Sequence, residues 1–234
     1  MKLKPLGVLT LLLLCGCLAQ SAPITGVTQM WMYDAETRKG TVHFENVSHK
    51  NIVAYDVGEY ITCKDGHVFV ASENTHMNMR GVFAPGQTRD QEVNGPTMME
   101  GADLTNPNNI RAEVDVVVYE DDTAEVTNQR AFESILEHRQ AEVEATKKIN
   151  EVVQKVLDDS TVTDQHAAIV TELQRLAVVA KKEEHFALSS LLDVRGSEIP
   201  QDKADMPAFI KRNEQRIAEE EPHANLTVVQ GVQP

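Results

Sequence analysis

The chain has 234 residues, a length that suits one or two domains, and it carries a formal net charge of −14. Such an acidic chain, in which no basic cluster occurs, repels phosphate backbones, so we expect no nucleic-acid partner. Of its three cysteines, Cys15 and Cys17 lie near the start and only Cys63 lies in the body, which excludes an intramolecular disulfide there.

Residues 1–22 have the order of charge and hydropathy that is typical of a secretory leader. Lys2 and Lys4 supply positive charge, the stretch from Val8 to Leu14 is apolar, and small residues follow. The apolar stretch is interrupted by glycines and falls short of the roughly 20 residues that a membrane span needs. We therefore predict that the leader is cleaved and that the protein is exported.

Two cleavage positions fit this leader. The ordinary signal peptidase could cut after Ala19, with Cys17 at the −3 position, and would give a periplasmic or secreted protein. The segment from Leu14 to Cys17 also resembles the lipobox of bacterial lipoproteins, in which a diacylglycerol is attached to the cysteine that follows the cut. Cys15 departs from the small residue that is usual there. We favour lipidation of Cys17, which would anchor the protein to an envelope membrane without spanning it.

Residues 23–127 show apolar side chains with a period of two. The clearest example runs from Ile110 to Tyr119, where aliphatic residues alternate with Arg111, Glu113 and Asp115. This alternation is typical of a half-buried antiparallel strand. Similar runs are Met30–Tyr33, Thr41–Glu45, Ile52–Val57, Tyr60–Cys63 and His67–Ala71. About seven strands separated by turns predict an antiparallel β-sandwich.

The alternation of apolar and polar residues stops over residues 94–109, where prolines, a glycine and asparagines predict a long loop. Long loops without secondary structure are uncommon in compact domains and are often functional. We favour a crossover between strands over a binding loop, because connections of this kind are common in sandwiches.

Residues 128–221 have a helical period and predict a hairpin of two helices followed by a third helix. The apolar side chains of the first helix form a stripe that ends at Asp158 to Ser160. A second apolar stripe follows and extends through Leu188 to Leu192. The third helix should begin near Met206, and residues 222–234 should form a flexible tail. The helix charges, including Glu142, are expected on the solvated face. With the sheets, these helices predict an α+β protein.

The first helix is too long to bury its whole apolar stripe against a small sandwich. We expect its start to lie near the sheets and its distal part to pack on the second helix. The residues expected near the sheets are Phe132, Ile135 and Leu136. The residues expected to meet across the hairpin are Val143, Ile149, Val153 and Val156 on one side and Ile169, Leu173, Leu176 and Ala180 on the other.

Four segments in order, Val42–Ser48, Lys50–Tyr55, Ala84–Gly86 and Val117–Ala124, resemble a group of uncharacterised exported bacterial proteins. The resemblance covers about residues 41–139. It implies an immunoglobulin-like sandwich of the kind found in cell-envelope proteins, followed by helices. Asp122 stands where this group would have glycine in the acidic turn. The group has no assigned activity that could be carried over.

Candidate chemistry in this sequence is sparse. His43, His49, His67 and His76 lie in the β-rich part, but none shows the short spacing of a known zinc motif. Cys63 is expected to be a buried, unreactive thiol rather than a nucleophile. The acids from Glu120 to Asp122 do not have the spacing of a calcium loop and are expected at a solvated hairpin tip. We therefore assign no catalytic, cofactor or metal residue.

The leading functional prediction is a non-catalytic binding or structural protein of the cell envelope, with an unknown ligand or envelope partner. One alternative is a secreted enzyme or metal-binding protein, which would require His43, His67 or His76 to converge with carboxylates in a pocket. A second alternative is an adaptor that docks a partner through its helices, which an exposed apolar stripe would favour.

Overall fold

The computed structural model describes residues 23–34, 36–37, 39–76, 83–94, 103–104 and 106–229. The predicted leader, including Cys17, lies outside these residues, as does most of the 94–109 segment. The lipid attachment and the role of that segment therefore stay predictions.

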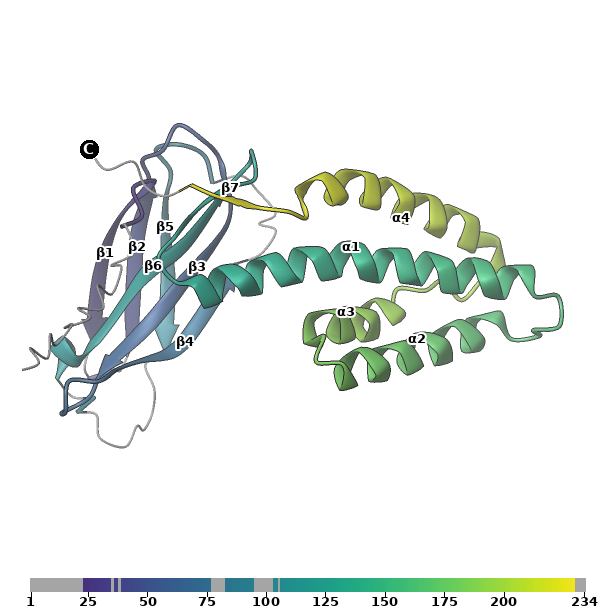
Figure 1. Ribbon diagram of the computed structural model, residues 1–234, viewed down its shortest axis with the longest axis horizontal. Coiled ribbons are helices and arrows are strands. Elements are labelled where there is room, and N and C mark those ends of the chain that lie inside the picture. Colours follow the sequence, from purple (N-terminus) through teal and green to yellow (C-terminus); the bar gives the residue numbers. More distant parts are fainter. Residues whose placement is uncertain are drawn as a thin grey trace, which may run out of the picture.

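Within the described residues the protein is α+β, with antiparallel sheets followed by four α-helices, as Figure 1 shows. The strands are β1 (Val27–Asp34), β2 (Lys39–Asn46), β3 (Ile52–Thr62), β4 (Val68–His76), β5 (Thr88–Asn94), β6 (Ile110–Tyr119), β7 (Thr123–Val126) and β8 (Thr227–Val228). The helices are α1 (Gln129–Asp158), α2 (Gln165–Lys182), α3 (Phe186–Gly196) and α4 (Met206–Glu220), with short 3-10 turns η1 (Pro107–Asn109), η2 (Lys203–Asp205) and η3 (Glu221–His223).

The strands form two sheets that share one core. The first sheet has the order β1-β2-β5, and the second has the order β4-β3-β6-β7-β8. All pairs are antiparallel except β7 and β8. Phe44 and Phe83 are fully buried, and their rings meet edge to face with centroids 5.5 Å apart. Tyr55 contributes a further edge-to-face contact with Phe44, so aromatic packing fixes how the two sheets face each other.

Two features of the sheets differ from the sequence prediction. The runs Ile52–Val57 and Tyr60–Cys63 belong to one strand, β3, because a shift of register between Glu59 and Tyr60 absorbs the break in their alternation. Strand β5 was not among the predicted runs, since its residues other than Val93 are polar and Val93 alone is buried among those of its side chains that the structure describes.

The helical arm, residues 129–220, starts directly on the second sheet. The side chain of Asn128 caps α1 by accepting hydrogen bonds from the backbone N–H groups of Arg130 and Ala131. Phe132 and Ile135 are buried against the outer face of this sheet, and Leu136 packs beside them. The expected position of these three residues is confirmed. Beyond them α1 projects away from the sheets (Figure 1).

The distal part of α1 packs on α2, as the apolar stripes predict. Ile149 and Val153 share one buried cluster with Ile169 and Leu173. Val143 is buried but does not belong to this cluster.

The stripe from Leu188 to Leu192 belongs to a separate helix, α3, so the chain has two helices where one was expected. The chain turns between α2 and α3 at Glu184, whose φ of 64° is incompatible with a continuing helix. This turn lets Leu188 and Leu192 fold back into the same core.

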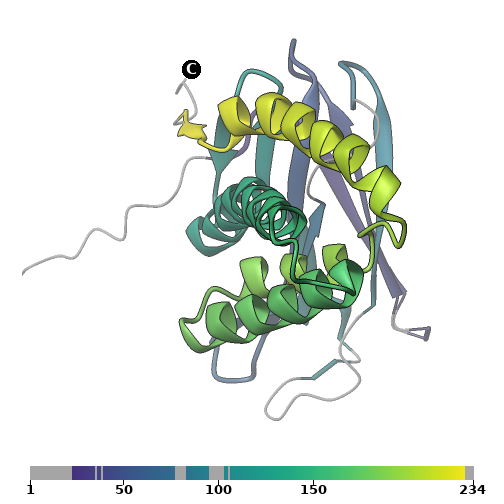
Figure 2. The same ribbon diagram turned by 90° about the vertical axis from the view of Figure 1, so that its right-hand side faces the viewer.

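Helix α4 runs along α1 on the side opposite α2 and α3, so α1 is the central helix of the arm (Figure 2). The chain then returns to the sheets, where β8 pairs with β7 and Leu226 packs near Phe132. The expected flexible tail differs from the structure at residues 222–229, because the open edge of β7 offers backbone partners to them. No helix in the described ranges has the length and hydropathy to cross a bilayer.

Candidate functional site

A pocket of about 230 Å³ lies where the arm leaves the second sheet. Its walls come from β3, the turn between β6 and β7, α1, and the end of α4 with η3. The lining residues are Val53, Glu120, Asp122, Arg139, Glu142, Glu219, Glu220 and His223. We call this the junction pocket, because both the β half, residues 23–127, and the helical arm contribute to it.

Arg139 is the most buried charged residue of the junction pocket, with 7% of its surface exposed. Its Nη1 donates to the carbonyl oxygen of His223 at 3.1 Å and to Asp122 Oδ1 at 3.4 Å. Burial lowers the pKa of Arg139 from its ordinary value, and the charge of Asp122 opposes this change. Its buried Nε has no hydrogen-bond partner among the described residues. An unmet donor of this kind costs free energy unless another molecule accepts from it.

Asp122 holds the turn between β6 and β7 against the end of the arm. Its Oδ2 lies 2.6 Å from Nδ1 of His223, in addition to the contact with Arg139. Its φ of 61° is the conformation that glycine would adopt in the acidic turn. An aspartate tolerates this conformation better than most residues do, and here its carboxylate also binds the arm.

The rest of the acidic turn is more exposed, as the sequence predicts. Asp121 Oδ2 lies 2.6 Å from Lys50 Nζ, and nearly half of each side chain is exposed. Hydrogen bonds from Lys50 and Thr123 lower the pKa of Asp121 to about 2. Asp121 therefore stays ionised near neutral pH, and it is not among the residues that line the pocket.

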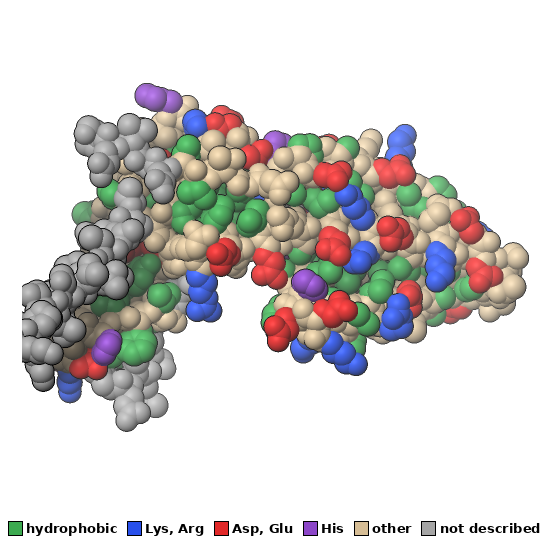
Figure 3. Space-filling model, viewed as in Figure 1, with side chains coloured by type: hydrophobic (Ala, Val, Ile, Leu, Met, Phe, Trp, Pro, Cys, Tyr) green, Lys and Arg blue, Asp and Glu red, His purple; other side chains and the backbone are tan. Residues whose placement is uncertain are grey.

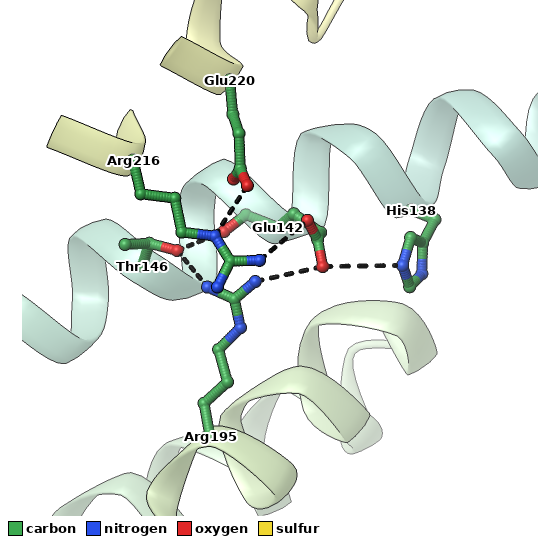
Figure 4. Close-up of polar contacts among 6 residues, drawn as sticks. All are labelled: His138, Glu142, Thr146, Arg195, Arg216 and Glu220. Atoms are coloured by element: carbon green, nitrogen blue, oxygen red, sulfur yellow. Dashed lines mark hydrogen bonds and ion pairs between the residues drawn. The ribbon is translucent and has the colours of Figure 1, made fainter. Parts of the chain in front are cut away.

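One wall of the junction pocket continues into a buried ionic network centred on Glu142 (Figure 4). Arg195 Nη2 donates to Glu142 Oε1 at 3.0 Å, and Arg216 Nη2 donates to Oε2 at 3.4 Å. Arg195 also donates to Thr146 Oγ1, one turn further along α1. His138 Nε2 lies 3.8 Å from Glu142 Oε1. The network therefore joins α1 to both α3 and α4.

Arg216 connects this network to Glu220, which also lines the pocket. Arg216 Nε donates to Glu220 Oε1 at 2.6 Å. Burial lowers the pKa of Arg216, but its contacts with Glu220 and Glu142 outweigh burial and raise it. The second carboxylate oxygen of Glu220, Oε2, is buried and has no partner within the described part of the chain.

The expected solvent exposure of Glu142 is wrong. The residue lies between the buried Ala141 and Val143, but a carboxylate beside apolar residues does not reveal burial by itself. Only the packing of α3 and α4 brings Arg195 and Arg216 to it. Glu144, by contrast, forms an exposed pair with Lys148 at 3.2 Å, and acidic and basic side chains are interspersed over the visible face of the arm (Figure 3).

The residues singled out from the sequence do not converge at this pocket. His43 lies on β2 beside Asp90, and His67 is an exposed residue just before β4. No cluster of three or more histidine, cysteine or acidic side chains suited to a metal occurs in the searched, described residues. Cys63 is 8% exposed, so its predicted burial is confirmed, while its low reactivity stays a prediction.

No protein-family model matches the chain, and no curated protein matches it. Among solved structures, the chain is similar to a crystal structure described as the ApaA protein of Bordetella pertussis. The alignment has 15% sequence identity and a TM-score of 0.19, and it covers 41% of this chain and 77% of that chain. A likeness this weak transfers neither fold nor function.

Proposed function

We propose that the protein is a non-catalytic binding protein of the bacterial cell envelope and that its ligand occupies the junction pocket. The observation that carries this proposal is the pocket itself, which both halves of the chain build around Arg139. Two buried polar atoms of its lining, Arg139 Nε and Glu220 Oε2, have no partner among the described residues. A bound molecule with hydrogen-bond donors would supply a partner for Glu220 Oε2, and an ordered water would supply one for Arg139 Nε.

The charges of the lining favour a cationic ligand. Five carboxylates line the pocket, from Glu120, Asp122, Glu142, Glu219 and Glu220, against one guanidinium and one imidazole. Arg195 and Arg216, which do not line the pocket, balance the negative charge of Glu142. Arg139 balances the negative charge of Asp122. Among the described residues Glu120 accepts hydrogen bonds from Asn51, a neutral donor, so the lining keeps an excess of negative charge. A small amine fits this charge and the volume.

Calorimetric titration with putrescine tests this proposal, with succinate as a control of equal chain length and opposite charge. Putrescine should bind to the mature protein, and Glu220→Gln should weaken binding by about tenfold, which corresponds to roughly 1.4 kcal/mol. Glu172→Gln, which alters an exposed pair with Arg175 on α2, should leave binding unchanged. Binding of succinate but not of putrescine, or no binding of either, would refute the proposal.

We also propose that the two facing sheets form an immunoglobulin-like sandwich and that the mature protein begins at a lipidated Cys17. The resemblance in residues 41–139 supports the first statement, and the lipobox-like segment from Leu14 to Cys17 supports the second. Intact-mass measurement tests the anchor: a chain that starts at Cys17 with an added lipid is expected. An unmodified chain that starts at Gln20 or later would contradict it, and Cys17→Ser should release a soluble protein.

A second candidate function is an adaptor that docks a partner through α2 and α3. Three large apolar side chains are exposed there, Val178 by 54%, Phe186 by 61% and Val194 by 61%. Val178 also lines a shallow groove between the two helices. A photo-crosslinking residue at Phe186 should give one discrete adduct in cells, which Val178→Ser with Val194→Ser should abolish. No adduct would leave the junction pocket as the sole candidate.

A further inference from the structure

The outer face of the first sheet carries two exposed methionines on its edge strand, β1. Met30 is 54% exposed and Met32 is 49% exposed. Trp31, between them, points the other way, because its indole Nε1 donates to the carbonyl oxygen of Ile110 in the opposite sheet at 3.1 Å. The two thioethers therefore share the face that is turned away from the core. This edge lies at the end of the molecule opposite the helical arm (Figure 1).

His43 lies on the same face, on the neighbouring strand. The register of β1 and β2 sets Met30 directly opposite His43 and Met32 opposite Thr41. Val42 and Phe44, on either side of His43, are fully buried, so the imidazole is on the outer face. Residues directly opposite each other have Cβ atoms about 4.5–5.5 Å apart, and diagonal neighbours are within reach of long side chains. Both thioethers can therefore approach one imidazole.

Asp90 orients this imidazole from the third strand. It stands directly opposite His43 on β5, and its Oδ1 lies 2.5 Å from His43 Nδ1. Because a carboxylate oxygen can only accept, this contact favours the tautomer with the proton on Nδ1, and in the neutral imidazole the lone pair of Nε2 is then available to a metal ion. Histidines that bind metals usually donate their other ring N–H to a carboxylate or carbonyl in this way.

We propose that Met30, Met32 and His43 form a binding site for a soft monovalent metal ion, Cu(I) or Ag(I), and that Asp90 is its positioning residue. Thioether and imidazole ligands select soft ions, whereas Mg²⁺ and Ca²⁺ require oxygen ligands. Three neutral ligands suit a monovalent ion. The sequence carries no local signal for this site, because its ligands meet only through the pairing of β1 with β2. The site is separate from the junction pocket, and neither proposal depends on the other.

Titration of the mature protein with Ag(I), a redox-inert substitute for Cu(I), tests this site by NMR of methyl-labelled methionine. The first equivalent should shift the two methyl signals that disappear in Met30→Leu and Met32→Leu. Leucine has a similar volume and these positions are exposed, so both variants should keep the fold. His43→Gln should weaken Ag(I) binding at least tenfold, while His67→Gln, at another exposed histidine, should not.

Two further measurements separate this site from other soft ligands and from a purely structural role of Asp90. Cys63→Ser should leave Ag(I) affinity unchanged, because its thiol is buried. Nitrogen NMR should show the Nδ1–H tautomer of His43 in the wild type and a mixture in Asp90→Asn. Two outcomes would overturn the proposal. One is that Ag(I) shifts the methyl signals of other methionines in place of those of Met30 and Met32, and the other is that Cys63→Ser abolishes Ag(I) binding.

Discussion

The two halves of the molecule compensate buried carboxylates in different ways. In the β half, Asp115 is 1% exposed and accepts hydrogen bonds from neutral groups, among them the hydroxyls of Tyr60 and Thr127. In the arm, the largely buried Glu142 meets the full positive charges of Arg195 and Arg216. Burial of a carboxylate costs free energy because its charge loses water. Neutral hydrogen-bond donors offset less of this cost than two guanidinium charges do. The stability of the β half should therefore respond to pH, and the stability of the arm should respond to the loss of a charged partner of Glu142.

Ile149→Asp should have the largest effect, because it adds a carboxylate to the apolar core of the arm. Ile149 is 1% exposed, so the variant should lose about 4 kcal/mol of unfolding free energy, or fail to fold. Urea denaturation measures this. Val178→Asp, on the exposed face of α2, is the matched control and should unfold like the wild type. An Ile149→Asp variant as stable as the wild type would show that the seam between α1 and α2 is not core.

Arg195→Ala should be the next most damaging change. Removal of one partner from a buried ion pair leaves the other charge uncompensated and typically costs about 3 kcal/mol. Here Arg216 still contacts Glu142, so the decrease in unfolding free energy should be somewhat smaller than for an isolated ion pair. The control is Arg175→Ala, which breaks an exposed pair and should leave the urea midpoint unchanged. Adding Glu142→Gln to Arg195→Ala should recover part of the loss.

Asp115→Asn should have the smallest effect at neutral pH and should remove a pH dependence. Burial raises the pKa of Asp115 above 3.8, the value expected in the unfolded chain. The wild type is therefore stabilised by this group below pH 3.8 and loses that contribution as pH rises through the raised pKa. Asparagine does not titrate, so the stability of the variant relative to the wild type should rise with pH. Denaturation of both proteins between pH 4 and pH 7 measures this, and parallel curves would contradict it.

The sequence predicts most of the elements but little of the site. Alternation is visible at the start of β6, where Ile110, Ala112 and Val114 are buried. It does not continue as predicted, because every residue from Val114 to Tyr119 is buried: Val117 and Tyr119 pack between the sheets, whereas Val116 and Val118 pack with the start of α1. Helical periodicity predicts the seam at Ile149. The prediction of strands by alternation fails for β5, whose mostly polar residues hide the second partner of β2. Helical periodicity fails at Glu184, since only the backbone conformation shows that one apolar stripe is divided between two helices.

The junction pocket could not be predicted, because its residues are brought together by folding over a long distance in the chain. Val53 on β3 and His223 on η3 both line it, and no local pattern connects them. Arg139 and Glu142 stand on α1 among charges that are mostly solvated, and nothing in their spacing distinguishes them. The return of the chain through η3 brings His223 to the pocket, and β8, which follows it, has two residues and is too short to predict.

A crystal structure of the mature protein grown with putrescine tests most directly whether the junction pocket receives a cation. We expect the diamine in the pocket, with one ammonium group within hydrogen-bonding distance of the carboxylates of Glu220 or Glu219. The ionic network around Glu142 should be unchanged, since it is already compensated. Putrescine bound elsewhere, with the pocket occupied by water alone, would contradict the proposed ligand site.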